Sequence, residues 1–249
     1  MDNEPQDAMA ATEHRPWPLP SSPWIMFQRW TNLLFAHWPL PPSTLRKFVP
    51  ENLTLDTFDG SGWVAVTPFR ITHLRPRFLP PVPGLSNFPE LNVRTYVTHK
   101  GEGGVFFFSL DAASRLAVSA ARTFYRLPYR YANMMTKREG DEIFYSCSRR
   151  ERSSAEFHAR YHPTSPIRQR QKGTLEHWLS ESYRLYTVSG KKLFHADIHH
   201  VPWPLQDAEA DIATNTMARA SGIELPHTAP LLHFAERLDV LIWPLKLSS

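Results

Sequence analysis

Proline is unusually frequent along this chain of 249 residues, which contains 23 prolines and only 10 glycines. Proline lacks a backbone N–H donor and interrupts both helices and central strands. Long uninterrupted helices are therefore not expected, and short strands joined by shaped loops are favoured. The chain is also long enough to bury a full core as one barrel or sandwich domain.

Alternation of apolar and polar side chains predicts most of the strands. In residues 90–97, Leu91 and Val93 point to one side, whereas Glu90, Asn92 and Arg94 point to the other. Residues 59–62, which read Asp-Gly-Ser-Gly, predict a hairpin between two flanking strands. The predicted strands cover residues 53–57, 63–67, 90–97, 105–110, 143–149, 155–162, 192–201 and 238–245.

Helical spacing is confined to two short segments, residues 112–125 and residues 175–186. The composition and these elements together predict a mainly β (α+β) protein, an antiparallel β-barrel or sandwich with one or two inserted short helices. Residues 1–22 are polar and proline-rich, so we expect a flexible leader there. Residues 23–249 are expected to form a single domain.

Several segments carry a resemblance to a known superfamily. Residues 45–56 (LRKFVPENLTLD), the strand that starts at Glu90, and residues 110–118 (LDAASRLAV) resemble acetoacetate decarboxylase. Residues 35–38 (FAHW), 88–97 (FPELNVRTYV), 108–112 (FSLDA), 127–129 (LPY) and 199–205 (HHVPWPL) are closer to the YqjF-like uncharacterised branch of the acetoacetate decarboxylase-like superfamily. Together these segments span residues 24–243, nearly the whole chain.

The resemblance implies a cone-shaped antiparallel barrel with an internal ligand pocket, often within a homo-oligomer. In the decarboxylase, a pocket lysine forms a Schiff base, and a second lysine lowers its pKa; that enzyme is the general example of this kind of lysine activation. Here the lysine pair falls on Leu127 and Pro128, and no lysine occurs between Lys100 and Lys137. The family's catalytic glutamate matches Glu90. Schiff-base chemistry is therefore not expected, and the resemblance leaves enzymatic activity open.

The polar face of residues 90–97 is the first candidate site. Alternate side chains of a barrel strand face the interior, where Glu90 would act as an acid, a base or an orienting carboxylate. Asn92 would be a polar clamp and Arg94 an anion contact. The alternative is a half-buried strand whose polar face lies in solvent.

Arginines on the first predicted helix form a second candidate. Arg115, Arg122 and Arg126 fall within a narrow arc, and Arg122 lies nearest to the family's active-site position. Arg122 is therefore a predicted anion contact, although a solvated or salt-bridged face explains the pattern equally well. His37 and His200 are predicted ligand-binding or proton-transfer residues, with packed core histidines as the alternative.

Metal and cofactor motifs are not recognisable in the sequence. His195, Asp197 and His199 alternate along a predicted strand, so the outer two lie about 13 Å apart, too far to share one ion. We therefore expect no metal and no cofactor. A single cysteine, Cys147, an N-terminus without a signal peptide and no run long enough to cross a bilayer favour a cytoplasmic protein without membrane contacts.

The net charge of +4 comes from 21 arginines and 7 lysines against 24 acidic residues. The functional prediction is a small-molecule-binding barrel for a carboxylate or other anionic metabolite; if it is an enzyme, it would be lyase-like and act without a Schiff-base lysine. The alternative is a non-catalytic interaction protein that uses the basic stretch 149–172 toward nucleic acid or an acidic partner. Because no nucleic-acid-binding motif accompanies this stretch, nucleic acid is not the expected partner.

Overall fold

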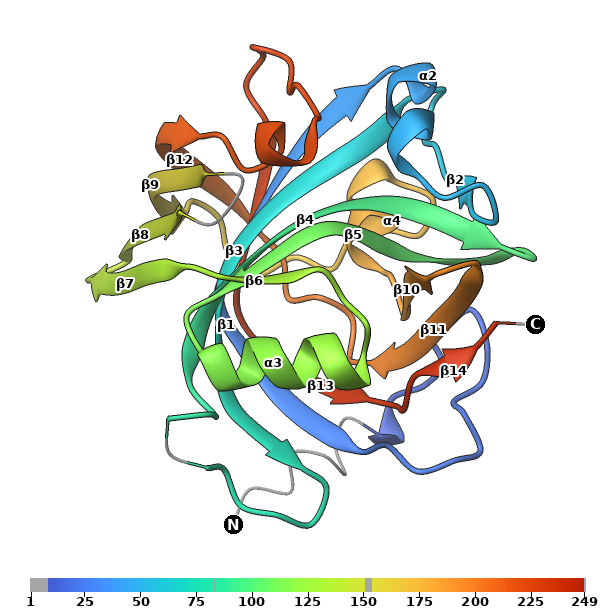
Figure 1. Cartoon of the computed structure of the whole chain (residues 1–249). Helices are drawn as coiled ribbons and strands as arrows, with labels where there is room; N and C mark the ends of the chain where they lie inside the picture. The colour runs from blue at the N-terminus through green and yellow to red at the C-terminus, as the bar shows by residue number, and fades with distance from the viewer. Residues whose placement is uncertain (1–8, 83, 151–153, 249) are drawn as a thin grey trace.

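The computed structural model describes residues 9–82, 84–150 and 154–248. Strands dominate it, and they join into one 14-stranded sheet that closes on itself (Figure 1). The strands are β1 (Met26–Leu40), β2 (Thr54–Leu55), β3 (Gly62–Pro76), β4 (Phe88–His99), β5 (Glu102–Ala112), β6 (Tyr129–Tyr131), β7 (Asn133–Glu139), β8 (Glu142–Arg149), β9 (Ala155–Pro163), β10 (Arg184–Ser189), β11 (Lys192–His199), β12 (Gln206–Asn215), β13 (Leu231–Ile242) and β14 (Lys246–Leu247). The helices are α2 (Pro42–Leu45), α3 (Arg115–Phe124) and α4 (Leu175–Ser180), with 3-10 turns η1 (Arg46–Phe48) and η2 (Arg219–Ser221).

The barrel is a ring formed by β1, β3, β4, β5, β10, β11 and β13, which the β11–β13 pairing closes. Most pairs in it are antiparallel, as predicted, and the mainly β barrel fold is confirmed. The sheet is nevertheless mixed, because β5 pairs in parallel with both β10 and β6. Beyond β13, the strands β12, β9, β8 and β7 continue as an outer sheet, which lies beside the barrel in Figure 1.

Two strands are much longer than the proline content predicts. Both β1 and β3 run for 15 residues, and Pro68 lies in the middle of β3. The pairing of β1 with β3 is interrupted between Thr31 and Ala36, where Asn32 has a φ of 51°. Pro68 falls in the matching stretch of β3. A proline is tolerated in a strand at such a bulge, so the long strand survives.

The barrel wall separates two hydrophobic cores. Inside, aromatic and aliphatic side chains such as Phe35, Phe69 and Trp203 fill the ring. Outside, Leu91 and Val93 of β4 pack with Tyr145 and other residues of the outer sheet. Residues on one strand alternate between the two cores, which is why both faces of β4 are buried and neither is in solvent.

The helices differ from their predicted bounds. The segment 112–125 is helical only from Arg115 to Phe124, and Ser114 caps its first turn by accepting from the Ala117 N–H. Only Val118 of this helix is fully buried against the barrel, whereas Leu116 and Phe124 are exposed. The second helix ends at Ser180 instead of residue 186, and the chain from Arg184 becomes β10.

The predicted hairpin is correct at its turn and wrong in its pairing. Phe58 and Ser61 form a bridge around Asp59 and Gly60, both of which have positive φ. The strand before the turn, β2, pairs with β4 instead of β3. The turn at residues 58–61 therefore forms as predicted, but the strand before it pairs with β4 and not with the strand after it.

The N-terminal segment from residue 9 contacts the barrel. The Arg15 guanidinium donates to the Ile198 carbonyl over 2.8 Å and lies across the Tyr183 ring. Arg184 lies over the Trp17 ring in the same region. These contacts place residues 14–17 against β10 and β11; residues 1–8 of the predicted leader lie outside the described residues.

Candidate functional site

Strand β4 directs a row of polar side chains into the barrel. Glu90, Asn92 and Arg94 are 3, 4 and 7% exposed, so all three are buried. They share the strand face of Phe88 and Tyr96, which belong to the inner core. The alternative of a solvent-facing polar strand is excluded. The polar side chains are themselves buried, and the opposite face, with Leu91 and Val93, is covered by the outer sheet.

Arg94 lies against an aromatic ring and close to His37. Its guanidinium is over the Phe35 ring, with 5.2 Å from the guanidinium carbon to the ring centroid. Ala65 pairs with both His37 of β1 and Arg94 of β4, so a small side chain separates these two. Within the described residues Arg94 forms no ion pair, although it interacts with the Tyr96 hydroxyl. A buried guanidinium without a counter-ion is costly, and this makes Arg94 the most informative residue of the interior.

His37 is held in one tautomer by its neighbours. The Tyr96 hydroxyl donates its only hydrogen to the Leu179 carbonyl over 2.7 Å. The His37 Nε2, 2.7 Å from the same hydroxyl oxygen, must then carry the hydrogen of that contact. His37 Nδ1 is left as a buried acceptor without a partner in the described residues. Burial, with Arg94 and His233 nearby, lowers the pKa of His37 well below its usual value, so the ring is neutral.

Glu90 is the buried acid of the site. Tyr129 of β6 donates to Glu90 Oε2 over 2.9 Å, and the Tyr145 hydroxyl donates to the Glu90 backbone carbonyl over 2.7 Å. Burial raises the pKa of the Glu90 carboxyl to about 8; the Tyr129 hydrogen bond opposes this rise and Asp111 adds to it. At neutral pH Glu90 is therefore mainly a protonated carboxylic acid, able to donate as well as to accept.

Several polar atoms facing the interior have no hydrogen-bond partner in the described part of the protein. Thr67 pairs with Asn92 across β3 and β4, which brings the Thr67 hydroxyl and the Asn92 amide together. The atoms concerned are His37 Nδ1, Thr67 Oγ1, Asn92 Oδ1, Arg94 Nε, Trp63 Nε1 and Trp203 Nε1. Buried polar groups are normally satisfied, so such a cluster is typical of a site that takes a polar ligand or ordered water.

Two predicted site residues lie away from this row. Arg122 is exposed on α3, and its Nε donates to the Tyr129 carbonyl over 2.8 Å. His200 is buried against the Tyr183 ring, 4.7 Å between centroids, and its Nδ1 lies 2.7 Å from the Val201 carbonyl. Burial lowers the pKa of His200. His200 therefore has the environment of a packed core histidine, and Arg122 is anchored outside the barrel.

Leu127 and Pro128, which match the lysine pair of the family, place no charged group in the barrel. Leu127 belongs to the inner core and Pro128 precedes β6. The side chain next along this segment that reaches Glu90 is Tyr129. A phenol therefore contacts the Glu90 carboxyl, and the two residues before it supply no amino group.

The histidine and acid pattern of β11 is used for structure. The Asp197 carboxylate pairs with Arg184 over 2.8 Å, and His199 Nδ1 lies 3.1 Å from Arg15. In the described part of the chain, no three His, Cys, Asp or Glu side chains are grouped so that they could hold a metal ion. Nor does any helix there have the length and apolar character needed to span a membrane.

Three residues of the site were missed from the sequence. Thr67 could have been found, because Trp63, Ala65 and Thr67 are two residues apart in β3 and therefore share one face of the strand. Tyr96 lies two residues beyond Arg94 and shares its parity. Tyr129 gave no such signal, because its contact with Glu90 depends on the parallel pairing of β5 with the three-residue strand β6.

Solved structures with the same fold define the class of this protein. The acetoacetate decarboxylase from Legionella pneumophila matches with a TM-score of 0.65 and 16% identity, over 95% of this chain and 93% of that one. The enduracididine biosynthesis enzyme MppR complexed with pyruvate matches with a TM-score of 0.64 and 11% identity, over 93% of this chain and 92% of that one. The protein thus has the acetoacetate decarboxylase-like fold, and its structural neighbours include enzymes.

The chain belongs to the DUF2071 family, whose model is described as an uncharacterized conserved protein and matches residues 27–239. The uncharacterized protein YqjF from Bacillus subtilis (strain 168) is 53% identical to it over 228 residues. That alignment covers 92% of this chain and 94% of YqjF. The predicted membership of the YqjF-like branch is confirmed.

Proposed function

We propose that the barrel interior binds a small carboxylate or similarly oxygen-rich anion, with Arg94 as its anion contact. The observation that carries this proposal is the buried Arg94 guanidinium without an ion-pair partner in the described residues. Guanidinium groups bind carboxylates through two parallel hydrogen bonds, and such a ligand would supply the missing negative charge. The complex of MppR with pyruvate, a carboxylate, supports the same ligand class for this fold.

The order of groups along β4 indicates the shape of the ligand. Arg94 and Glu90 are four residues apart, so their backbones are about 13 Å apart, with Asn92 midway. Side chains on a strand can lean along it, so the span between these two functional groups can be shorter than that between their backbones. The ligand would place its carboxylate at Arg94 and its middle part between Asn92 and Thr67. A carbonyl or hydroxyl oxygen at its other end would then lie near Glu90.

Glu90 gives this arrangement a means of moving a proton. As a neutral acid held by Tyr129, it would donate a hydrogen bond, or a proton, to a ligand oxygen. The chemistry proposed is non-covalent proton transfer of the lyase type, without a Schiff base. If borohydride trapped a stable imine between the protein and a keto acid, this part of the proposal would be wrong.

The test compares the wild type with Arg94→Met in a thermal-shift screen of small mono- and dicarboxylates. A ligand at a hundred times its Kd should stabilise the wild type by about 2.7 kcal/mol, roughly 5–10 °C for a chain of this size. In Arg94→Met the shift should vanish. The free variant should be more stable than the free wild type by about 1–3 kcal/mol, because an unpaired buried charge has been removed.

The matched control is Arg138→Met, on the outer sheet, where the guanidinium pairs with Glu236. This variant should keep the ligand shift of the wild type. If Arg94→Met is instead strongly destabilised and no carboxylate shifts the wild type, then Arg94 has a structural role and the proposal fails.

The described part of the basic stretch 149–172 does not favour the interaction-protein alternative. Arg149 is buried with Asp111, and Arg160 pairs with Asp211 over 3.3 Å. Arg170 pairs with Asp207 over 2.6 Å. Because acids of β12 already neutralise much of this stretch, less positive charge remains for an acidic partner.

A further inference from the structure

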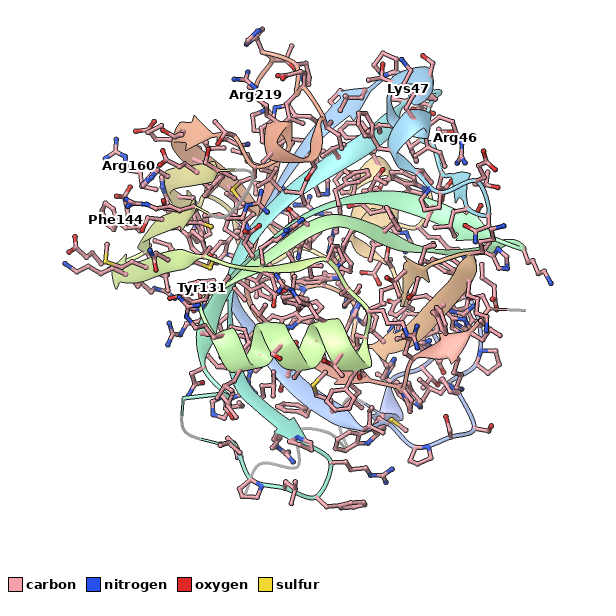
Figure 2. All side chains as sticks on the ribbon, viewed as in Figure 1. Arg46, Lys47, Tyr131, Phe144, Arg160 and Arg219 are labelled. Carbon is pink, nitrogen blue, oxygen red and sulfur yellow. The ribbon has the colours of Figure 1, made fainter. Side chains whose placement is uncertain are left out.

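A hollow of about 280 Å³ lies between α3 and β6, and no residue of the polar row on β4 lines it. The helix contributes most of its lining. The residues around it are Arg115, Val118, Ser119, Arg122, Thr123 and Tyr131. This hollow is called the α3 groove below. Tyr131 lies beside the first turn of α3 (Figure 2).

Both arginines of the α3 groove are fixed in place by contacts that leave their charge uncompensated. The Arg115 guanidinium stacks on the Tyr131 ring at 3.9 Å from carbon to centroid. Arg122 uses its Nε to donate to the Tyr129 carbonyl over 2.8 Å, which leaves its two terminal amino groups for other acceptors. Neither arginine forms an ion pair within the described residues.

The spacing of Arg115 and Arg122 places both side chains on the same side of α3, next to the groove. Arg115 and Arg122 are seven residues apart, two turns of helix, so they project from the same side about 10 Å apart along the axis. Ser119 lies between them on that side and also lines the groove. The side chain of an arginine is long enough for both guanidinium groups to reach a ligand above Ser119. Because two like charges near each other are unfavourable without an anion, the groove is suited to a multiply charged one.

We propose that the α3 groove is a binding site for the phosphate group of a small molecule. A phosphate offers several acceptor oxygens and up to two negative charges. Two fixed guanidinium groups and one hydroxyl match these through charge-assisted hydrogen bonds. The site is distinct from the carboxylate site proposed inside the barrel, because Glu90, Asn92 and Arg94 do not line it.

The experiment is calorimetric titration of the full chain with inorganic phosphate and with pyrophosphate at physiological salt. The wild type should bind at least one of them, and Arg115→Gln with Arg122→Gln should weaken binding by at least about tenfold. The matched control is Arg126→Gln. Arg126 also stacks on an aromatic ring, that of Phe194, but does not line the groove, so this variant should change Kd by less than about twofold.

A second variant protects the test against a folding defect. Ser119→Trp fills the exposed groove without altering either arginine, and it should also abolish binding. Phosphate binding that survives Ser119→Trp, or that Arg126→Gln weakens as much as the double variant does, would overturn the proposal. The carboxylate thermal shift should remain in all of these variants, which separates this site from the one at Arg94.

A phosphate group can belong to a soluble metabolite or to a lipid headgroup, and exposed Leu116 and Phe124 lie on the same helix. Flotation with phosphatidylcholine vesicles, with and without phosphatidic acid, distinguishes these sources. Binding of free phosphate or pyrophosphate supports a soluble ligand. Flotation that needs phosphatidic acid and is lost in the double variant supports a headgroup. If neither occurs, the proposal is wrong.

Discussion

Glu90 and Arg94 lie on the same face of one strand, yet their surroundings act on them differently. The Glu90 carboxyl has Tyr129 as its polar partner, and burial keeps it protonated near neutral pH. The Arg94 guanidinium keeps its charge over an aromatic ring. The interior therefore contains a neutral acid at one position and a cation at the other, which is a useful pair for a ligand with a negative end and a neutral oxygen.

The raised pKa of Glu90 predicts a specific dependence of stability on pH. Its value of about 8 in the folded protein exceeds the usual 4.5, so the native state holds the proton more tightly than the unfolded state. Stability should therefore fall as the pH rises from about 4.5 to 8 and then level off. At 1.36 kcal/mol per pKa unit, the full effect is on the order of 5 kcal/mol.

Glu90→Gln should remove this dependence, because an amide keeps the Tyr129 contact and does not ionise. Urea unfolding at pH 6.5 and 9 checks this prediction, since the other raised carboxyl, Asp111 with a pKa of about 6, contributes little change above pH 6.5. Glu156→Gln, at an exposed position of β9, is the control and should keep the wild-type slope. Equal slopes in the wild type and Glu90→Gln would show that the Glu90 carboxyl is not held protonated.

At the scale of elements, the sequence predicts strands well where alternation is strong. Strands β4, β8 and β9 were located almost to the residue, because large apolar side chains alternate with polar ones. Strand β12 was missed. Its inward residues are mostly alanines, and these give little contrast with their neighbours. The helix from residue 175 was extended too far because its spacing continues past Ser180, where the backbone leaves the helix at Glu181.

In the candidate site too, the residues set by local alternation could be predicted from the sequence, whereas the contacts set by strand pairing could not. The row Glu90, Asn92 and Arg94 follows from the period of one strand, so its inward direction could be inferred from the sequence. The contacts of Tyr129 with Glu90, and of Ala65 with His37 and Arg94, depend on which strands are neighbours. Strand pairing between distant segments is not determined by local pattern, which is also why β2 was assigned to the wrong partner.

The parallel junction of β5 and β10 is one step of the ring and depends on one glycine. A Cβ at Gly104 would lie 2.6 Å from the Arg184 carbonyl oxygen and 2.9 Å from the Tyr186 ring. Gly104→Ala should therefore push β10 away from β5 and destabilise the protein by about 1–3 kcal/mol in urea unfolding.

Gly103→Ala is a matched control one residue away, since a Cβ there meets nothing within 4 Å. Its unfolding free energy should stay within about 0.5 kcal/mol of the wild type. Equal effects of the two substitutions would mean that backbone freedom, and not the close approach of β10, determines the requirement for glycine.

At the scale of the whole molecule, the barrel and the outer sheet share a buried ion pair. Asp111 of β5 and Arg149 of β8 are fully enclosed between the two layers, 3.4 Å apart. Burial raises the pKa of Asp111 to about 6, although Arg149 and Arg130 act in the opposite direction. Arg149 was predicted as part of a basic surface, and its burial corrects that interpretation. The exposed pair of Arg160 and Asp211 lies on the same outer sheet, where Figure 2 shows Arg160 at its margin.

Arg149→Met should destabilise the protein at pH 7.5 by about 3–5 kcal/mol, because it leaves the Asp111 carboxylate buried without its partner. The loss should become smaller at pH 5, where Asp111 is protonated and no longer needs a cation. Urea unfolding of the wild type and the variant at both pH values measures this difference. Arg160→Met should cost less than about 1 kcal/mol at either pH, since its pair is exposed. A loss in Arg149→Met that is the same at both pH values would show that the packing of the arginine stem, and not its charge, joins the two layers.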